Sequence, residues 1–335
     1  MTRPPLPSPA PRASSAAGVD AGDRPGPLVS AAWLAAHIDD PDAVLLHVSP
    51  TRRVYARRHL PDAVFVPLHR DLARIGTDPV TGDARREWLV PGRADVETTL
   101  GRWGARLDPR GVAPRLVFYD DVGLNRQAIR GYWLLRLYRY PAERLHVLDG
   151  GLRAWVAAGG DVTADLPARQ PAPTTPVPSA SAAMPATAPG AAIRLGERDA
   201  SLIATADEVR AWSAEASVPG GPSRLLDVRS PDEFVGADGH GALHAGRIPG
   251  ARHRWFGDLL RADGTLRPVD EAIGLVRGSG ADPAEVRATY CMGGVRAALG
   301  WFVLHELAGY ADVRNYVGSW EEWGNRTDLP IDADR

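Results

Sequence analysis

The chain repeats itself: short segments of its first half recur in its second half in the same order. Self-similarity at this scale is the signature of a duplicated structural unit. The repeat therefore predicts two domains of one fold. The matched pairs are 45–50 with 225–231, 59–63 with 247–251, 116–121 with 287–292, 131–140 with 300–310 and 147–155 with 315–323.

Two proline-rich stretches separate and flank the halves. Residues 1–27 contain seven prolines, and the stretch 167–192 contains seven more. Segments of proline, alanine, serine and threonine bury too little apolar area to offset the entropy of ordering. We therefore predict a disordered tail at 1–27, a first domain at 28–166, a linker at 167–200 and a second domain at 201–335.

Each half alternates short apolar runs with helical patterns. Runs such as 43–48, 115–119, 224–228 and 286–290 have the length and β-branching of buried parallel strands. Residues 296–308 carry apolar groups at helical spacing, and a glycine follows. The pattern predicts an α/β fold in which a mainly parallel sheet is flanked by helices, present twice.

Composition excludes several functions. The 39 basic and 41 acidic residues nearly cancel, so we expect neither nucleic acid nor a membrane surface as a partner. All basic residues are arginine, which removes Schiff-base and Walker-type lysine chemistry. One cysteine and nine histidines without metal-ligand spacing predict no metal and no cofactor. With no membrane-spanning apolar run and no secretory leader pattern, the expected location is cytoplasmic.

The single cysteine, Cys291, stands where a predicted strand ends and a predicted helix begins. Ligands of a parallel sheet gather at the carboxyl ends of its strands, where a turn into a helix aims several N–H groups at one point. Gly293 and Gly294 permit such a turn, and Arg296 adds a positive charge that favours the thiolate, the nucleophilic form. A buried cysteine with only a packing role is the alternative interpretation.

These features resemble the two-domain rhodanese-type sulfurtransferases, over almost all of the chain from Leu28 to Leu329. The resemblance is carried by the six-residue loop from Cys291 to Arg296 and by the segments DVRSPDEF at 227–234, GRIPGA at 246–251 and GSWEEWGN at 318–325. In this family only the second copy is catalytic. Asp120 or Asp121 stands near the first-copy equivalent of Cys291, in agreement with an inactive first domain.

The resemblance implies that the Cys291 thiolate takes a sulfur from a small anionic donor, carries it as a persulfide and passes it to cyanide or to a thiol, including a thioredoxin-like one. Asp227 is expected to orient its loop by hydrogen bonds. Loop amides and an arginine fork would hold the anions. The predicted binding residues are Arg229, Arg296, His244, Met292, Gly293, Gly294 and Val295.

Alternatives stay open at this stage. A cysteine-dependent phosphatase or arsenate-handling enzyme is disfavoured because only four residues separate Cys291 from Arg296, whereas the phosphatase loop has five. A non-catalytic sulfur-carrier module is a third hypothesis. The loop after Cys291 has neither the basic residues typical of thiosulfate-specific members nor the Gly-Ser-Gly of mercaptopyruvate-specific ones; thiosulfate is the favoured donor.

Overall fold

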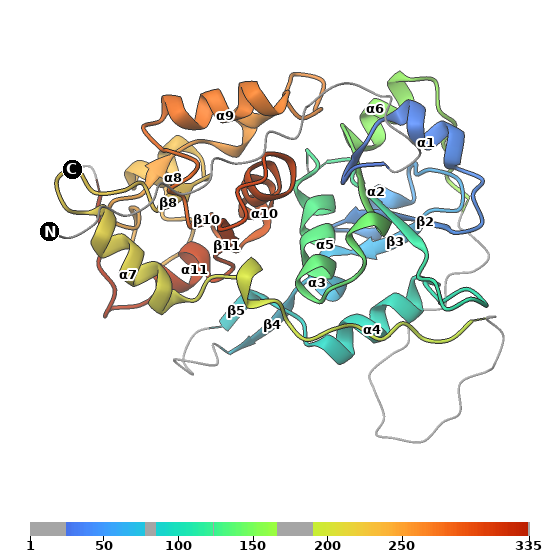
Figure 1. The fold of residues 1–335 in the computed structure, drawn as a ribbon, viewed down its shortest axis with the longest axis horizontal. Helices are drawn as coiled ribbons and strands as arrows, with labels where there is room; N and C mark the ends of the chain where they lie inside the picture. The colour runs from blue at the N-terminus through green and yellow to red at the C-terminus, as the bar shows by residue number, and fades with distance from the viewer. Residues whose placement is uncertain (1–24, 78–84, 123, 166–189, 334–335) are drawn as a thin grey trace, which may run out of the picture.

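The computed structural model describes residues 25–77, 85–122, 124–165 and 190–333 (Figure 1). Most of the predicted tail and most of the predicted linker lie outside these ranges. The described end of the predicted linker runs along the first domain: the Gly196 amide donates to the Tyr138 carbonyl at 3.0 Å, and Ile193 and Leu195 are buried in the core. Apolar packing fixes this segment to the domain it leaves.

The first domain is built on a five-stranded parallel sheet. One of its inner strands pairs Leu46 with Val64 on one side and with Phe118 on the other. Both faces of these strands are buried, as their unbroken apolar sequences predict. In spatial order the strands are β1 (Leu28–Val29), β7 (Leu145–Leu148), β6 (Arg115–Tyr119), β2 (Ala43–Ser49) and β3 (Val64–Pro67).

The second domain repeats this sheet with four strands in the matching order and an isolated parallel bridge, Ile203 to Asn315, where β1 would lie. All its pairings are parallel, so the structure confirms the predicted duplicated α/β fold. The strands are β11 (Arg314–Asn315), β10 (Ala288–Tyr290), β8 (Leu225–Asp227) and β9 (Arg252–His253).

Helices cover the sheets of both domains (Figure 1). Capping boxes start two of them: Thr205 with Glu208, and Ser230 with Glu233. The helix predicted at 296–308 is observed as α10 with a π-helical continuation. The bounds in the first domain are α1 Ala31–His37, α2 Arg52–Tyr55, α3 Leu68–Asp71, α4 Arg93–Arg102, α5 Arg126–Leu137, η1 Ala142–Arg144 and α6 Gly151–Ala157. In the second they are η2 Ala200–Leu202, α7 Ala206–Ala216, α8 Pro231–Val235, η3 Phe256–Leu259, α9 Val269–Gly278, α10 Val295–Trp301, η4 Phe302–Leu307 and α11 Ser319–Trp323.

The two domains share one core. Helices α5 and α10, which occupy equivalent positions in the repeat, pack against each other at the centre of the molecule (Figure 1). Trp133 of the first domain and Trp301 of the second belong to one buried apolar cluster. Across the same seam Glu306 accepts hydrogen bonds from Tyr132 at 2.9 Å and from Arg136 at 3.1 Å. The seam is therefore built like a domain interior.

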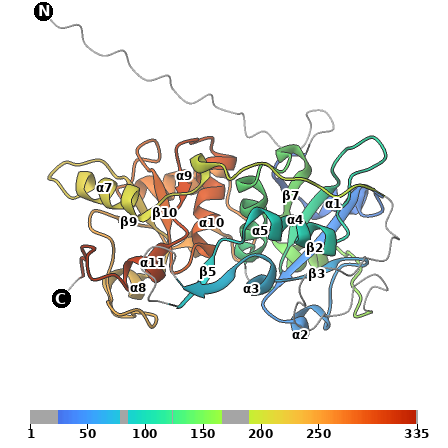
Figure 2. The same ribbon diagram turned by 90° about the horizontal axis from the view of Figure 1, so that it is seen from below.

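An antiparallel hairpin extends from the first domain toward the second. Its strands are β4 (Arg74–Thr77) and β5 (Arg85–Leu89), and Figure 2 shows β5 beside α3 and reaching toward α11. The amide of Glu87 donates to Glu321 Oε1 at 2.7 Å. The hairpin thus brings residues of the first domain to the carboxyl edge of the second sheet.

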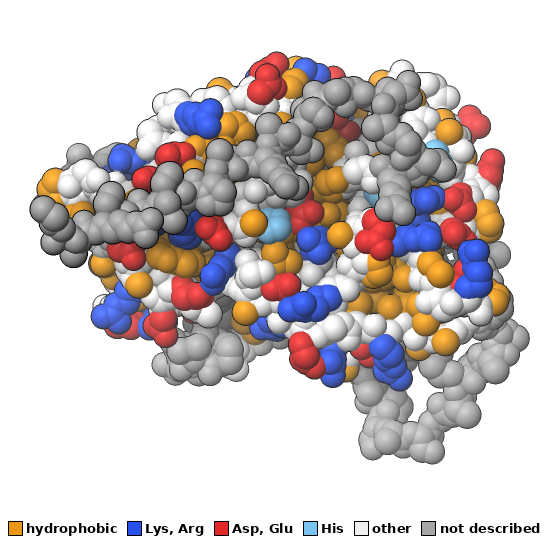
Figure 3. All heavy atoms as spheres, in the orientation of Figure 1, with side chains coloured by type: hydrophobic (Ala, Val, Ile, Leu, Met, Phe, Trp, Pro, Cys, Tyr) orange, Lys and Arg blue, Asp and Glu red, His pale blue; other side chains and the backbone are white. Residues whose placement is uncertain are grey.

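The surface carries mixed charge. Figure 3 shows basic and acidic side chains interspersed on the face it presents, in keeping with a formal net charge of −2. None of the helices in the described ranges is both long and apolar enough to cross a bilayer.

Candidate active site

Cys291 directly follows β10, where the carboxyl ends of the second sheet's strands meet, and α10 begins four residues later. Its amide donates to Ser319 Oγ at 3.1 Å, and its carbonyl accepts the Trp320 amide at 2.9 Å. Gly294 has φ 80°, the left-handed conformation that the glycine was expected to supply. Strand β10 and helix α11 thus fix the backbone of the loop on both sides.

The thiol of Cys291 is buried, and a first-domain side chain lies against the loop that follows it. Sγ accepts the Gly294 amide at 3.2 Å, and the residue is only 1% exposed. A Cβ placed on Gly293 would come within 2.1 Å of Cδ1 of Trp88, so the indole rests directly on the loop. The thiol is therefore buried, and the loop that follows it is covered by Trp88 of β5.

Arg296 is held by a carboxylate of the second domain. Its Nη1 and Nη2 donate to the two oxygens of Glu233 at 2.6 and 2.7 Å. Burial favours the neutral acid, but the hydrogen bonds and charge of Arg296 outweigh it and lower the pKa of Glu233 to about 2. The positive charge that the sequence assigns to the loop is therefore neutralised locally.

Arg229 is buried rather than poised for a donor. It is 1% exposed, its Nη2 donates to Asp227 Oδ2 at 2.6 Å and to the Gly246 carbonyl at 2.8 Å, and its guanidinium lies 4.5 Å from the Trp320 ring centre. Burial opposes the charge, but Asp227 outweighs this and raises the pKa of Arg229. The bonds to Asp227 and Gly246 occupy Nε and Nη2, so this placement favours a structural role for the pair, and binding of a donor by Arg229 stays a prediction.

The remaining predicted residues have varied surroundings. Met292 is half-buried against the second-domain core, and Val295 is buried. His244 participates through its backbone: its amide donates to the Gly324 carbonyl, and its own carbonyl accepts from Trp320 Nε1 at 3.0 Å. Binding of a donor by these residues stays a prediction.

Three residues from the first domain approach the Cys291 loop, and the sequence analysis missed all three. Trp88 covers Gly293, as described, while Arg126 and Arg130 lie one helical turn apart on α5. The charges of both arginines act on Cys291. Their spacing of four on one helix, near the matched residue Asp120, was the one signal in the sequence that could have drawn attention to them.

The first-copy counterpart of the Cys291 loop is closed by its own side chain. The carboxylate of Asp120 accepts backbone hydrogen bonds from Asn125 at 3.2 Å, Gln127 at 3.1 Å and Ala128 at 3.3 Å. An anionic group thus fills the turn between strand and helix, as the physics of such turns favours. The same turn in the second copy is occupied by the Cys291 sulfur.

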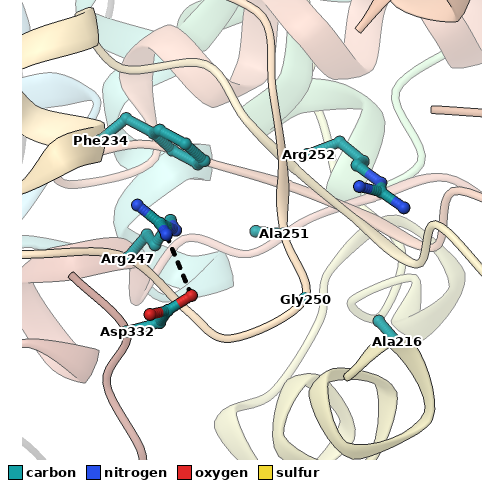
Figure 4. Close-up of a pocket in the computed structure, with 7 residues that line it drawn as sticks. All are labelled: Ala216, Phe234, Arg247, Gly250, Ala251, Arg252 and Asp332. Carbon is teal, nitrogen blue, oxygen red and sulfur yellow. Dashed lines mark hydrogen bonds and ion pairs between the residues drawn. The ribbon is translucent and has the colours of Figure 1, made fainter. Parts of the chain in front are cut away.

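A separate hollow of about 300 Å³ lies on the second domain (Figure 4). In it Arg247 is paired with Asp332 at 3.1 Å and lies 4.7 Å from the Phe234 ring centre. Figure 4 shows Arg252 directed away from this pair. Cys291 is not among its lining residues. Across the described ranges no group of three His, Cys, Asp or Glu side chains could hold a metal ion.

The family model for the rhodanese-like domain matches this chain twice, at residues 30–158 and 205–326. The matched ranges coincide with the two sheets and their helices. The chain therefore belongs to the rhodanese family, with two copies of the domain in tandem.

Curated relatives carry sulfur-transfer names. The chain is 32% identical to the thiosulfate sulfurtransferase of Corynebacterium glutamicum, over 92% of this chain and 91% of that protein. It is 30% identical to the sulfur carrier protein TtuD of Thermus thermophilus, over 92% and 96%. These relatives support sulfurtransferase chemistry as a class.

A solved structure shares the fold. The anaerobic ergothioneine biosynthesis enzyme of Chlorobium limicola, in complex with trimethyl histidine, has a TM-score of 0.69 and 23% identity, covering 96% of this chain and 73% of that one. The wild-type structure of EanB has a TM-score of 0.68 at 23% identity, covering 92% and 69%. At this identity the likeness supports the architecture alone.

Proposed function

We propose that this protein moves a sulfane sulfur from a small anionic donor, with thiosulfate favoured over 3-mercaptopyruvate, through a persulfide on Cys291 to cyanide or to a thiol acceptor. The observation that carries the proposal is the position of the Cys291 sulfur: it follows β10, accepts the Gly294 amide and lies in the field of Arg126, Arg130 and Arg296. An amide donor and nearby guanidinium groups are the kind of partners that an anionic sulfur intermediate requires.

The reaction balances without an oxidant or a cofactor. The Cys291 thiolate attacks the outer sulfur of thiosulfate; an S–S bond to Cys291 forms, the S–S bond of the donor breaks, and sulfite leaves with its electron pair. Cyanide then attacks the outer sulfur of the persulfide, and thiocyanate leaves while the thiolate is restored. The Gly294 amide, which donates to Sγ, can stabilise the thiolate before it attacks the donor and again after thiocyanate has left.

Charge supports thiosulfate as the donor. The pairs Arg296–Glu233 and Arg229–Asp227 are each neutral, and Arg126 interacts with the charge of Asp120, whereas no carboxylate of the described residues acts on Arg130. The site therefore carries a surplus of positive charge before the thiol ionises. A dianionic donor benefits more from that surplus than a monoanionic one.

The test is intact mass after exposure to donor alone. Wild-type protein treated with thiosulfate and freed of excess reagent should gain one sulfur atom, lose it when cyanide is added, and release an equivalent of thiocyanate. Cys291→Ser should gain none, because a hydroxyl is protonated and far less nucleophilic at neutral pH. Treatment of the same preparation with 3-mercaptopyruvate shows which of the two donors loads Cys291 with sulfur faster.

Three outcomes would contradict the proposal. Phosphate release from an aryl phosphate without sulfur uptake would favour the phosphatase alternative. Sulfur uptake from a persulfidated protein but never from free donors would favour a carrier role, the function that the Thermus relative's name states. Undiminished thiocyanate formation by Cys291→Ser would remove Cys291 from the chemistry.

A further inference from the structure

Arg130 is a fully buried arginine of the domain that lacks the reactive cysteine. It is 0% exposed, and its guanidinium lies 4.8 Å from the Trp133 ring centre. Nε and Nη2 make two long hydrogen bonds, to the carbonyls of Leu72 at 3.4 Å and Trp88 at 3.5 Å. Nη1 is buried and has no hydrogen-bond partner. The guanidinium of Arg130 thus donates hydrogen bonds to carbonyl oxygens but to no carboxylate of the described residues, although burial of its positive charge is unfavourable.

The unpartnered Nη1 faces the Cys291 loop. It lies 3.2 Å from the position that a Cβ would occupy on Gly294, the residue whose amide donates to Cys291 Sγ. Burial lowers the pKa of Arg130 to about 10, and the one ionisable group that opposes this is Cys291. In these surroundings the cysteine sulfur is the only available counter-charge among the described residues.

Arg126 lies one turn earlier on α5 and nearer to solvent. Its guanidinium lies 5.5 Å from the ring centre of Phe256, a residue of the second domain, so it spans the seam. In the described part of the chain it has no hydrogen bond or ion pair. Burial lowers its pKa, Asp120 and Cys291 oppose that shift, and Arg296 adds to it. Arg126 is thus a seam cation that interacts with the charges of Asp120 and Cys291 and whose guanidinium donors are bound by no described residue.

We propose that α5 of the first domain completes the active site of the second: Arg130 is the counter-ion that stabilises the Cys291 thiolate and persulfide, and Arg126 binds the anionic end of the sulfur donor. The assignment of Arg126 rests on the proposed function, whereas that of Arg130 rests on the chemistry of the thiol alone. The charged groups that act on Cys291 are then Arg126 and Arg130 from α5 and the Glu233-bound Arg296 from α10.

The repeat provides an independent argument. At the matched turn of the first copy, an anion, the Asp120 carboxylate, is satisfied by three amides. At the turn of the second copy one amide, that of Gly294, donates to the sulfur. A side-chain cation supplied from α5 across the seam compensates for this smaller number of donors.

The experiment compares Arg130→Gln with Arg126→Gln, two equal losses of charge on one helix. The first readout is the pH midpoint of Cys291 alkylation by iodoacetamide, which requires no sulfur transfer. We expect Arg130→Gln to raise the midpoint by about one pH unit or more, because the substitution removes a buried positive charge that favours the thiolate. Arg130→Lys, which keeps the charge, should stay close to wild type.

The second readout separates the two roles. Arg126→Gln should raise KM for thiosulfate by about tenfold, the loss of one charge-assisted contact, while shifting the alkylation midpoint less than Arg130→Gln does. A folded Arg130→Gln with the wild-type midpoint overturns the counter-ion role. An unchanged KM in Arg126→Gln overturns the donor role, and failure of sulfur transfer in the wild type removes the proposed function without affecting the alkylation result.

A third measurement covers the case in which Arg130→Gln does not fold. If the folded state stabilises the thiolate, the unfolded state binds more protons, and stability gains with rising pH. The difference in unfolding free energy between wild type and Cys291→Ala should then increase from pH 6 to pH 9. A difference that stays constant over this range would contradict stabilisation of the thiolate and hence the role of Arg130.

Discussion

At the scale of single residues, the site is organised by how each guanidinium is compensated. Arg229 and Arg296 are bound by carboxylates of their own domain, Asp227 and Glu233. Among the described residues Arg130 has two carbonyls, the Trp133 ring and the charge of the sulfur, but no carboxylate. The arginines near the loop therefore differ in their partners: two are in carboxylate pairs and one is not.

Replacement of Arg229 distinguishes these classes. Arg229→Met should lower the unfolding free energy by about 3–5 kcal/mol, because it leaves Asp227 as a buried charge without its partner. The protein that remains folded should keep the wild-type KM for thiosulfate. Chemical denaturation and steady-state kinetics measure the two effects.

Arg252→Met is the matched control for that substitution. Arg252 is exposed, so its replacement should change stability by less than about 0.5 kcal/mol. A raised KM in Arg229→Met with little loss of stability would instead support the donor-binding role that the sequence predicts for Arg229.

The sequence could predict what is local to the loop. The strand before Cys291, the turn at Gly294 and the helix after it are all encoded within about a dozen neighbouring residues, and the structure has them in that order. Trp88, Arg126 and Arg130 could not be placed, because they are more than 160 positions away and meet the loop only when the domains pack. The partner of Arg229 was likewise hidden, since a motif does not show whether a guanidinium turns inward or toward solvent.

At the scale of elements, the β4–β5 hairpin of the first domain lies against the loop that follows Cys291. Its residue Trp88 lies against Gly293, and its Glu87 amide is anchored to Glu321 of α11. A donor approaching Cys291 from this side must displace the indole. The hairpin belongs to the first domain, so that domain supplies the cover as well as the arginines of α5.

Trp88→Ala should speed alkylation of Cys291 by neutral iodoacetamide by about tenfold or more, since a large apolar cover is removed from a buried thiol. The rate is compared at a pH where the thiol is fully ionised in both proteins. Trp33→Ala, a half-buried tryptophan that stacks on His37 of α1, should leave the rate unchanged. Equal rates for Trp88→Ala and wild type would show that reagents reach Cys291 by another route.

At the scale of the whole molecule, the seam between the domains contains polar contacts as well as apolar core. Asp149, which follows β7, accepts the Leu266 amide of the second domain at 2.8 Å. Burial raises the pKa of Asp149 to about 6, and the Leu266 hydrogen bond only partly opposes this. The folded state therefore holds this proton more tightly than the unfolded state, so the contribution of Asp149 to stability is lost as pH rises through about 4 to 6.

Asp149→Asn should be more stable than wild type at pH 7.5, by about 1 kcal/mol after allowance for partial exposure, since the amide keeps an oxygen for Leu266 without a buried charge. The gain should disappear below about pH 4, where the carboxyl is neutral in both states. Denaturation curves at the two pH values measure it. Asp161→Asn, at an exposed position, is the control, and an equal gain at both pH values would rule out the electrostatic cause.

In the first domain, the turn after β6 is filled by the carboxylate of Asp120. This affects how substitutions in that domain would be interpreted. The first half contains no cysteine, yet the two arginines of α5 and the indole that lies against the Cys291 loop belong to it. Substitutions that abolish turnover should therefore occur in both halves. Those on α5 would be easy to misinterpret as damage to a domain with no part in the reaction. If the proposal holds, neither half is sufficient for sulfur transfer by itself.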